Sequence, residues 1–323
     1  MGNFFKSLFL SKPNRDLQDE TGDSNNKEND FDVLKYDGVR AQRMGKLVYA
    51  EKCFRAAIEL KEDFQTLSYL ASVEVSQGKL DEALAVLDRM VELQSENIAV
   101  RLNRVNLLFM LGKIDEIVSD CQQIIGQDET NAVAYYQMAR AKKEKSDLLG
   151  AIADLTRSVS LKEDFVEAYQ LRAEVLLLMG QLNEALDDVE KVNALAPEEE
   201  SAPLLKGRIF ETMQDLAAAE KEYRKVLELN PFNREAALSL GNLLIASEKA
   251  DDAIALYDEV IDLMPEFAKA YAERGRAKNL KGDKEGAFSD LKKSIELNPE
   301  SDEAKLMNGE HSNFDNLYKG GIY

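Results

Sequence analysis

Five amide or guanidinium side chains recur along the chain at multiples of 34 residues. They are Asn106, Arg140, Arg208, Asn242 and Arg276. An asparagine amide both donates and accepts hydrogen bonds, so it can bind a peptide backbone, and a guanidinium can bind a carboxylate through two parallel N–H groups. Packing between helices does not require polar groups of this kind at a fixed interval. The chemistry that these residues favour is therefore the binding of peptide groups or acids.

The sequence lacks the residue patterns of an enzyme active site. It has no glycine-rich phosphate loop, no metal-spaced cluster of histidines or cysteines and no nucleophile elbow. The single histidine, His311, stands near the C-terminus, so the commonest general base is missing from the rest of the chain. Cys53 and Cys121 are far apart in sequence and are predicted to be buried apolar residues. We therefore expect a protein that is not an enzyme and that has no cofactor and no metal.

The elements that carry the five polar residues are predicted to be helices that repeat along the chain. Residues 78–95, GKLDEALAVLDRMVELQS, place their apolar residues at the i, i+3, i+4, i+7 spacing of a helix buried on one face. Similar stretches recur after a first step of 33 residues and later steps of 34. A fixed period of this length indicates a solenoid of stacked helical hairpins. The repeats are numbered in the order 31–63, 64–97, 98–131, 132–165, 166–199, 200–233, 234–267 and 268–301.

The repeated residues resemble those of the tetratricopeptide repeat (TPR) family, whose unit is a helix–turn–helix of 34 residues. Positions are counted from the first residue of each repeat. Position 8 is a small residue in every repeat except the third, which has Val105, and position 20 is alanine in every repeat except the third, which has Ile117. Because small residues there let two helices approach closely, we expect the helices of the third repeat to lie slightly further apart. Proline stands at position 32 of the last four repeats, where it ends a helix. The resemblance implies an all-α, right-handed superhelical solenoid of about eight TPR units with a short C-terminal capping helix.

The same resemblance implies that the first helix of each repeat lines a concave groove, which binds an extended peptide or a helix of another protein. The residues expected in this peptide-binding groove are Asn106, Phe109, Tyr136, Arg140, Arg208, Leu238, Asn242 and Arg276. One subgroup of the family binds the C-terminal carboxylate of heat-shock chaperones, but no three successive repeats here carry its full set of lysine, asparagine and arginine residues. An alternative interpretation is that the arginines pair with acids on the next helix.

The first 30 residues contain an apolar hook followed by a polar tether. Phe4, Phe5, Leu8 and Phe9 would share one face of a short helix, and residues 11–30 are polar and are expected to be disordered. The hook is too short to span a bilayer. Two interpretations of it stay open. It could bind a partner protein or a membrane surface, the latter making the protein a peripheral membrane or envelope assembly factor, or it could pack on the first repeat as a cap.

The C-terminal residues and the charge complete these expectations. Residues 302–323 would form a capping helix and a flexible aromatic tail, and the tail could mediate self-association by entering the groove of a second copy. The net charge of −19 provides no positive footprint for nucleic acid, so no nucleic-acid partner is expected. We expect a cytoplasmic protein, peripheral to a membrane only if residues 1–10 bind one. Its predicted role is that of a protein–protein interaction scaffold or adaptor.

Overall fold

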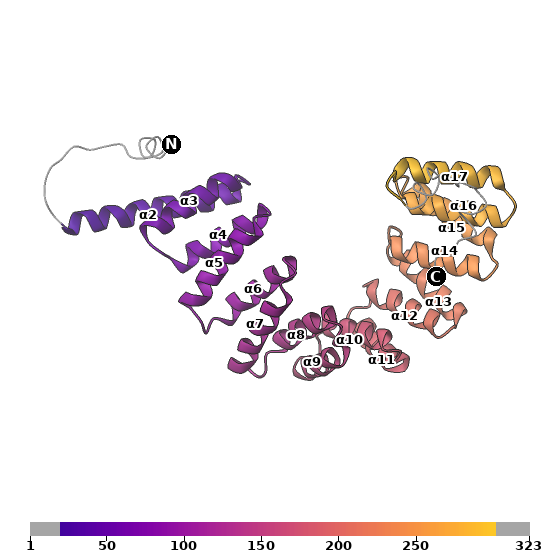
Figure 1. Cartoon of the computed structure of the whole chain (residues 1–323), viewed down its shortest axis with the longest axis horizontal. Coiled ribbons are helices and arrows are strands. Elements are labelled where there is room, and N and C mark those ends of the chain that lie inside the picture. Colours follow the sequence, from indigo (N-terminus) through magenta and orange to yellow (C-terminus); the bar gives the residue numbers. More distant parts are fainter. Residues whose placement is uncertain (1–19, 302–323) are drawn as a thin grey trace. The chain divides into compact units, whose positions relative to one another are not determined.

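The structure, a computed structural model, describes residues 20–301, with side chains from Lys27 onward. These residues form sixteen helices and contain no strand (Figure 1). The helices are α2 (Glu20–Arg43), α3 (Leu47–Leu60), α4 (Phe64–Ser76), α5 (Leu80–Leu93), α6 (Ile98–Met110), α7 (Ile114–Gln127), α8 (Ala132–Glu144), α9 (Leu148–Leu161), α10 (Val166–Leu178), α11 (Leu182–Leu195), α12 (Ser201–Thr212), α13 (Leu216–Leu229), α14 (Arg234–Ala246), α15 (Ala250–Leu263), α16 (Ala268–Leu280) and α17 (Lys284–Leu297).

The chain divides into two compact units, with the boundary between Glu129 and Thr130. The first unit contains α2 to α7, and the second contains α8 to α17. In each unit, an even-numbered helix packs against the helix that follows it, and that second helix packs against the first helix of the next pair. Stacked helical hairpins of this kind confirm the all-α repeat solenoid predicted from the 34-residue period.

A residue with left-handed backbone conformation links the two helices of each pair. Gly78 has a φ of 74°, as expected for the glycine that precedes a second helix. Three pairs hold the same conformation without glycine, at Ser146, Gln214 and Glu248, where φ is between 60° and 64°. Since such residues rarely adopt positive φ, the packed hairpin itself must impose the turn at these points.

The first helix begins earlier than the repeat pattern indicates. Helix α2 starts at Glu20, whereas the first repeat was expected to start at residue 31. The tether predicted to be disordered over residues 11–30 is therefore helical from Glu20 onward. Phe31 is buried, and the exposed Lys61 side chain pairs with Glu28 at 3.1 Å. Once the packed turns around Phe31 have formed, each further helical residue adds a hydrogen bond without a new nucleation cost, which accounts for the extension.

Positions 8 and 24 compensate each other in size in the repeats where position 24 is aromatic. A Cβ atom added at Gly38 would lie 2.5 Å from Cε1 of Phe54, and one added at Gly207 would lie 2.4 Å from Cε1 of Tyr223. Real Cβ atoms do not approach other atoms so closely, so the aromatic ring at position 24 occupies the space that a side chain at position 8 would need. Glycine is therefore required where the facing residue is aromatic.

The third repeat follows the same rule with the sizes exchanged. Its larger residue, Val105, is at position 8, and position 24 is the small Cys121; both are fully buried. The wider helix spacing expected in this repeat from Val105 and Ile117 stays a prediction, because the smaller Cys121 offsets part of the volume that Val105 adds. Cys53 and Cys121 are both buried, as predicted.

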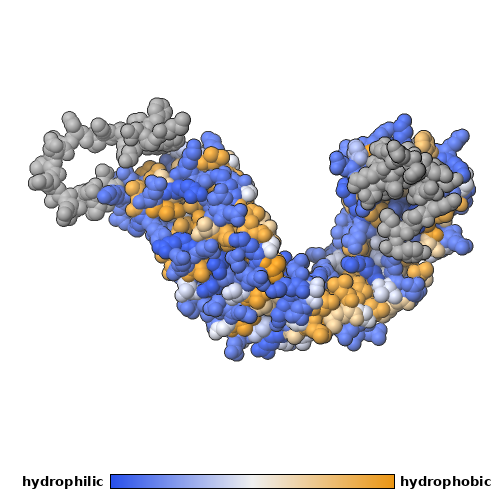
Figure 2. All heavy atoms as spheres, in the orientation of Figure 1, coloured by the Kyte–Doolittle hydropathy of each residue, from blue (hydrophilic) through white to orange (hydrophobic). Residues whose placement is uncertain are grey.

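Several predicted features lie outside the described residues. These are the hook with Phe4, Phe5, Leu8 and Phe9, the first part of the tether, the capping helix and the C-terminal tail. Among the helices of residues 20–301, none is both long enough and apolar enough to cross a membrane. Hydrophilic side chains cover much of the visible surface, with apolar patches between them (Figure 2).

Candidate peptide-binding surface

An open groove of about 320 Å³ lies on the first compact unit, between the first helices α4 and α6. One side is a ridge of exposed serines, Ser68, Ser72 and Ser76, which recur every four residues along α4. The other side carries polar and apolar residues of α6. Apolar side chains that include Leu87 and Met90 of α5 form the floor. None of the eleven lining residues is charged, although 31% of the residues in the chain are.

Helix α6 places one predicted groove residue, Asn106, in this groove. Asn106 is exposed, and both Asn103 and Met110 line the same groove. The Met110 side chain is 61% exposed, which is unusual for a large apolar residue in a folded chain and indicates a contact surface. Phe109, also predicted, is half-buried on α6 and does not line the groove.

A second, basic groove of about 520 Å³ adjoins α4 on the side of α2. Arg40 and Arg43 are exposed there, and neither pairs with a carboxylate in the part of the chain that the structure describes. The Lys35 ammonium, in contrast, binds Asp63 at 2.9 Å. Tyr69 of α4 also lines this groove. The sequence analysis did not identify these arginines, because it compared position 9 of the repeats with one another. Position 9 of the first repeat is Val39.

In the second unit, Tyr136 and Arg140 form a local stack on α8. The Tyr136 ring packs against Phe165 with ring centroids 5.0 Å apart, and the Arg140 guanidinium lies 5.8 Å from the Tyr136 centroid. Arg140 Nη1 also donates a hydrogen bond of 2.7 Å to Oε1 of Gln137. Burial raises the pKa of the Tyr136 hydroxyl above its usual value. Arg140 is thus held on its own helix.

The other predicted arginines make long contacts with acids. Arg208 Nη1 of α12 lies 4.0 Å from Glu235 of α14, and Arg276 Nη1 lies 3.4 Å from Glu273 on its own helix, α16. The side chains of Arg208 and Glu235 are about half exposed, so the pair contributes little to stability. The alternative interpretation was that arginine pairs with an acid on the next helix. It describes Arg208, whose acid lies on the next first helix, but not Arg276.

The structure distributes the predicted residues over both compact units. Asn106 and Phe109 belong to the first unit, and the other six belong to the second. There, the first helices α8, α10 and α12 contact one another in series, as do α14 and α16. Leu238 packs against the apolar core of α14 and α15, and Asn242, one turn further along α14, is exposed.

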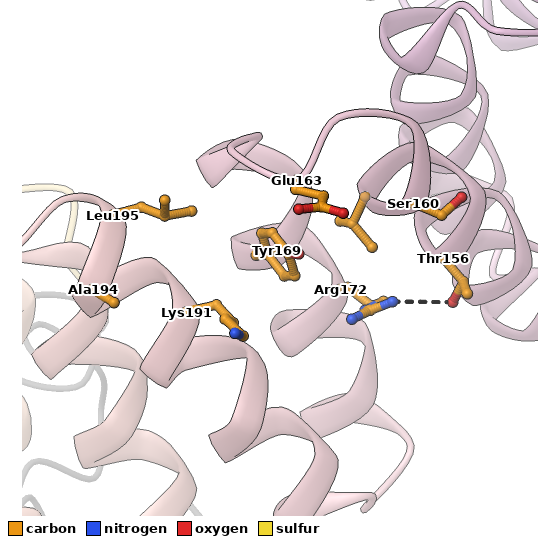
Figure 3. A pocket seen from close by; sticks show the side chains of 9 residues that line it. Thr156, Ser160, Glu163, Tyr169, Arg172, Lys191, Ala194 and Leu195 are labelled. Carbon is orange, nitrogen blue, oxygen red and sulfur yellow. Dashed lines mark hydrogen bonds between the residues drawn. The ribbon is translucent and has the colours of Figure 1, made fainter.

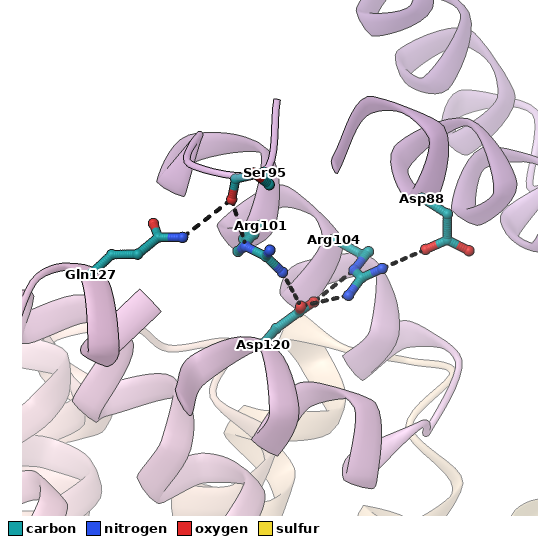
Figure 4. A network of polar contacts seen from close by, with 6 residues as sticks. All are labelled: Asp88, Ser95, Arg101, Arg104, Asp120 and Gln127. Carbon is teal, nitrogen blue, oxygen red and sulfur yellow. Dashed lines mark hydrogen bonds and ion pairs between the residues drawn. The ribbon is translucent and has the colours of Figure 1, made fainter. Parts of the chain in front are cut away.

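Away from these surfaces, a charge network crosses the seam between two repeats (Figure 4). Arg104 of α6 donates from Nε to Asp120 at 2.7 Å and from Nη1 to Asp88 of the preceding repeat at 2.7 Å. Arg101 adds a hydrogen bond of 3.1 Å to the same Asp120 carboxylate, which is 1% exposed. The hydrogen bonds that Arg104 donates to Asp120 raise the pKa of the Arg104 guanidinium, so its charge is fixed. Asp120 therefore organises two guanidinium groups inside the fold.

The same arrangement recurs in the fifth and eighth repeats. Arg172 bonds Asp188 with two contacts of 2.7 Å and reaches Thr156 of the preceding repeat at 3.2 Å. These residues border an open pocket of about 510 Å³ between α9 and α11, where Arg172 points toward Thr156 (Figure 3). Arg274 likewise bonds Asp290 and Asp258. Sequence reasoning missed these pairs, although an arginine and an aspartate 16 residues apart at positions 7 and 23 would have revealed them.

Comparison with known proteins identifies the family. Residues 38–98, 204–265 and 239–302 match a family model described as tetratricopeptide repeat. The chain belongs to the tetratricopeptide repeat family. As its fold is that family's repeat solenoid, it is a protein-interaction scaffold in architecture. Within residues 20–301, no group of three or more histidine, cysteine, aspartate or glutamate residues is placed to hold a metal ion.

Curated relatives match only part of the chain. It is 30% identical over 131 residues to the DnaJ homolog subfamily C member 3 of Gallus gallus, covering 38% of this chain and 26% of that protein. The Bos taurus protein of the same name is 28% identical over 169 residues, covering 47% and 34%. The TPR repeat-containing thioredoxin TTL4 of Arabidopsis thaliana is 34% identical over 95 residues, covering 29% and 13%. The matched segments thus span about a third or less of each relative's length.

Solved structures share the fold at lower identity. A tetratricopeptide repeat protein from Parabacteroides merdae superimposes with a TM-score of 0.51 at 19% identity, covering 90% of this chain and 98% of that one. A chain of the APC/C hetero-tetramer Cut9–Hcn1 gives a TM-score of 0.55 at 14% identity, covering 86% and 53%. Identities this low establish a common fold and no shared partner.

Proposed function

We propose that the chain is an adaptor that holds an extended peptide segment of a partner protein on the exposed face of its first helices. The observation that carries the proposal is the uncharged groove between α4 and α6, with Asn103, Asn106 and the serine ridge on its sides and an apolar floor. In a chain of net charge −19, an uncharged groove avoids repelling a ligand of either sign.

The groove offers the two kinds of contact that bind an extended peptide. The amides of Asn103 and Asn106 can donate to and accept from a peptide backbone, which gives affinity without dependence on sequence. Met110 supplies a flexible apolar surface that can adapt to different side chains. We therefore expect ligands with small apolar side chains next to the asparagines.

The second unit would contribute the charged contacts. Arg208 is exposed, and its pairing with Glu235 at 4.0 Å is too long and too hydrated to hold it firmly. A ligand carboxylate could replace Glu235 in a shorter, bidentate pair. Asn242 is also exposed, on the next first helix. Arg140, Tyr136, Leu238 and Arg276 stay proposed contacts of the same ligand class, whereas Phe109 would support the floor from behind.

The test is peptide display on the full-length chain, followed by affinity measurements on the selected peptides. Asn106→Ala should weaken binding about tenfold, because the buried peptide groups lose a hydrogen-bond partner. Arg208→Glu should weaken acidic peptides by a similar factor. Two matched controls are Asn183→Ala and Arg224→Glu, which change exposed residues of the second helices α11 and α13.

Selected peptides that bind both variants and both controls with native affinity would contradict the proposed surface. The alternative role, a membrane or envelope assembly factor recruited by residues 1–10, stays a prediction, because the hook lies outside the described residues. Self-association through the C-terminal tail also stays a prediction, because the tail lies outside the described residues.

A further inference from the structure

One helix face is exposed in the first repeat but buried in later ones. Where a repeat follows another within a compact unit, positions 3 and 10 of its first helix are at most 4% exposed. At position 3 these are Thr66, Val100, Ala168, Ala202, Ala236 and Ala270, and at position 10 they are Val73, Leu107, Val175, Ile209, Leu243 and Ala277. They are buried because the second helix of the preceding repeat packs on the first helix of the next.

The equivalent face of α2 has no preceding repeat within the described residues. Val33 and Arg40 stand at its positions 3 and 10, and together with the flanking Tyr36, Asp37 and Met44 they form what we call the end face. Their spacing of three or four residues, with one adjacent pair, places them on one side of the helix. Val33 is 52%, Tyr36 67% and Met44 60% exposed. Three large apolar side chains in one stripe are a surface that a protein normally covers.

We propose that the N-terminal hook covers the end face and takes the place of the second helix of a preceding repeat. The apolar residues of the hook, Phe4, Phe5, Leu8 and Phe9, match the apolar stripe in character. This proposal is independent of the peptide-binding function.

The dimensions of the chain agree with this occupant. Residues 33–44 span about 16 Å along α2, and a helix of ten residues is about 15 Å long. The start of α2 at Glu20 is about 20 Å from Val33 along the helix. Residues 11–19 reach up to about 30 Å when extended, so the hook can return to the end face.

Two other occupants of the end face, a second copy of the chain and an anionic membrane, are less favoured. A segment joined by a short linker acts at an effective concentration in the millimolar range, which exceeds that of a second copy at ordinary protein concentrations. An anionic membrane would be repelled by the net charge of −19, whereas Asp37 and Arg40 on the face itself offset each other. The chain's own N-terminus is therefore the occupant to test.

The experiment compares the full-length chain with a chain that lacks residues 1–12, by hydrogen exchange and mass spectrometry. Deletion should speed exchange of residues 33–44 about tenfold or more, the factor expected from uncovering one buried apolar side chain. Val33→Asp should have a similar effect in the full-length chain and none in the truncated one. Val48→Asp is the matched control, since Val48 on α3 is 60% exposed at a position where later repeats are also exposed.

Three results would overturn the proposal. The first is unchanged exchange after deletion, or an equal effect of Val33→Asp in both chains. The second is a doubled mass in light scattering that Val33→Asp abolishes, which would assign the end face to a second copy. The third is flotation of the full-length chain, but not the truncated one, with phosphatidylserine vesicles, which would assign the hook to a membrane.

Discussion

Gly241 and Tyr257 occupy one volume: a Cβ atom at Gly241 would lie 2.0 Å from the hydroxyl oxygen of Tyr257. Both residues are buried, on the first and second helices of the seventh repeat. The contact is with a rigid ring fixed between helices, so neither partner can move aside without separating them. The pairing of positions 8 and 24 is thus a condition for closing the hairpin.

Gly241→Ala should destabilise the chain by about 1–3 kcal/mol through overpacking. The added methyl group must displace the Tyr257 ring or push α14 away from α15. Chemical denaturation followed by circular dichroism measures the loss. The double variant Gly241→Ala with Tyr257→Leu reproduces the alanine–leucine pair of the second and fourth repeats, and should recover a large part of it. Equal losses in the single and double variants would contradict the size rule.

Tyr257→Phe and Tyr223→Phe should have different effects, although both rings are fully buried. The Tyr223 hydroxyl donates a hydrogen bond of 2.7 Å to Glu211, whereas the Tyr257 hydroxyl has no partner in the described structure. Losing the first hydroxyl should cost about 0.5–1.5 kcal/mol. Losing the second removes a desolvated polar group and should leave stability unchanged or raised. Thermal unfolding of the two variants tests this, and a larger loss for Tyr257→Phe would refute it.

Asp120→Ala should be among the most destabilising single changes, at about 3–5 kcal/mol. It removes the acid that compensates Arg101 and Arg104 in the interior, and those guanidinium groups would remain buried with less compensation. Glu62→Ala is the control, because its pair with Arg89 is exposed and should contribute little to stability. Urea denaturation measures both losses. If the two variants have the same urea midpoint, the network has no structural role.

Two neighbouring glutamates should respond to pH with opposite signs. A hydrogen bond of 2.6 Å from Lys79 lowers the pKa of Glu51, whereas burial raises the pKa of Glu74. Glu51 therefore stabilises the fold above its unfolded pKa, and that stabilisation is lost as pH falls through its depressed folded value. The ionised form of Glu74 instead opposes folding at neutral pH, and this cost disappears once pH falls below its unfolded pKa.

Stability measured between pH 4 and pH 8 in two variants separates these effects. Glu51→Gln should be less stable than the native chain at neutral pH, with the difference shrinking in acid. Glu74→Gln should be more stable at neutral pH, with the gain shrinking in acid, and Arg55 would keep Glu51 as a partner. If both variants shift in the same direction at neutral pH, the assignment of these pKa directions is wrong.

The helical repeat was readable from the sequence because it depends on local patterns. A stripe of apolar residues and a turn glycine such as Gly78 recur within each repeat, so the repeat can be identified without knowledge of tertiary contacts. The early start of α2 could not be read, because polar residues without periodicity resemble a disordered segment until Phe31 is known to be packed. The effect of Val105 on the helix spacing stays a prediction, because it depends on the facing Cys121.

The binding surface was predicted in part. Asn106 was found because it stands at a position that recurs. Arg40 and Arg43 were missed because the comparison followed position 9. Arg40 stands at position 10, which is buried in later repeats, so its exposure follows from the place of α2 at the start of the first unit. Arg43 stands at position 13, which is exposed in later repeats as well. Asp120 was not singled out, since composition alone does not distinguish a solvated carboxylate from a buried one.

The bridge that Arg104 forms between Asp120 and Asp88 implies that added salt does not weaken every seam between neighbouring repeats equally. A repeat tied to its predecessor in this way loses part of that connection when ions screen the half-exposed Asp88. The sixth and seventh repeats meet without such a bridge, because position 7 of the seventh is the buried Leu240. Salt leaves that apolar contact intact or strengthens it, and among the described residues it acts at this seam only on the partly exposed pairs Arg208–Glu235 and Lys249–Glu220. Raising the ionic strength would therefore change the order in which the repeats separate from one another.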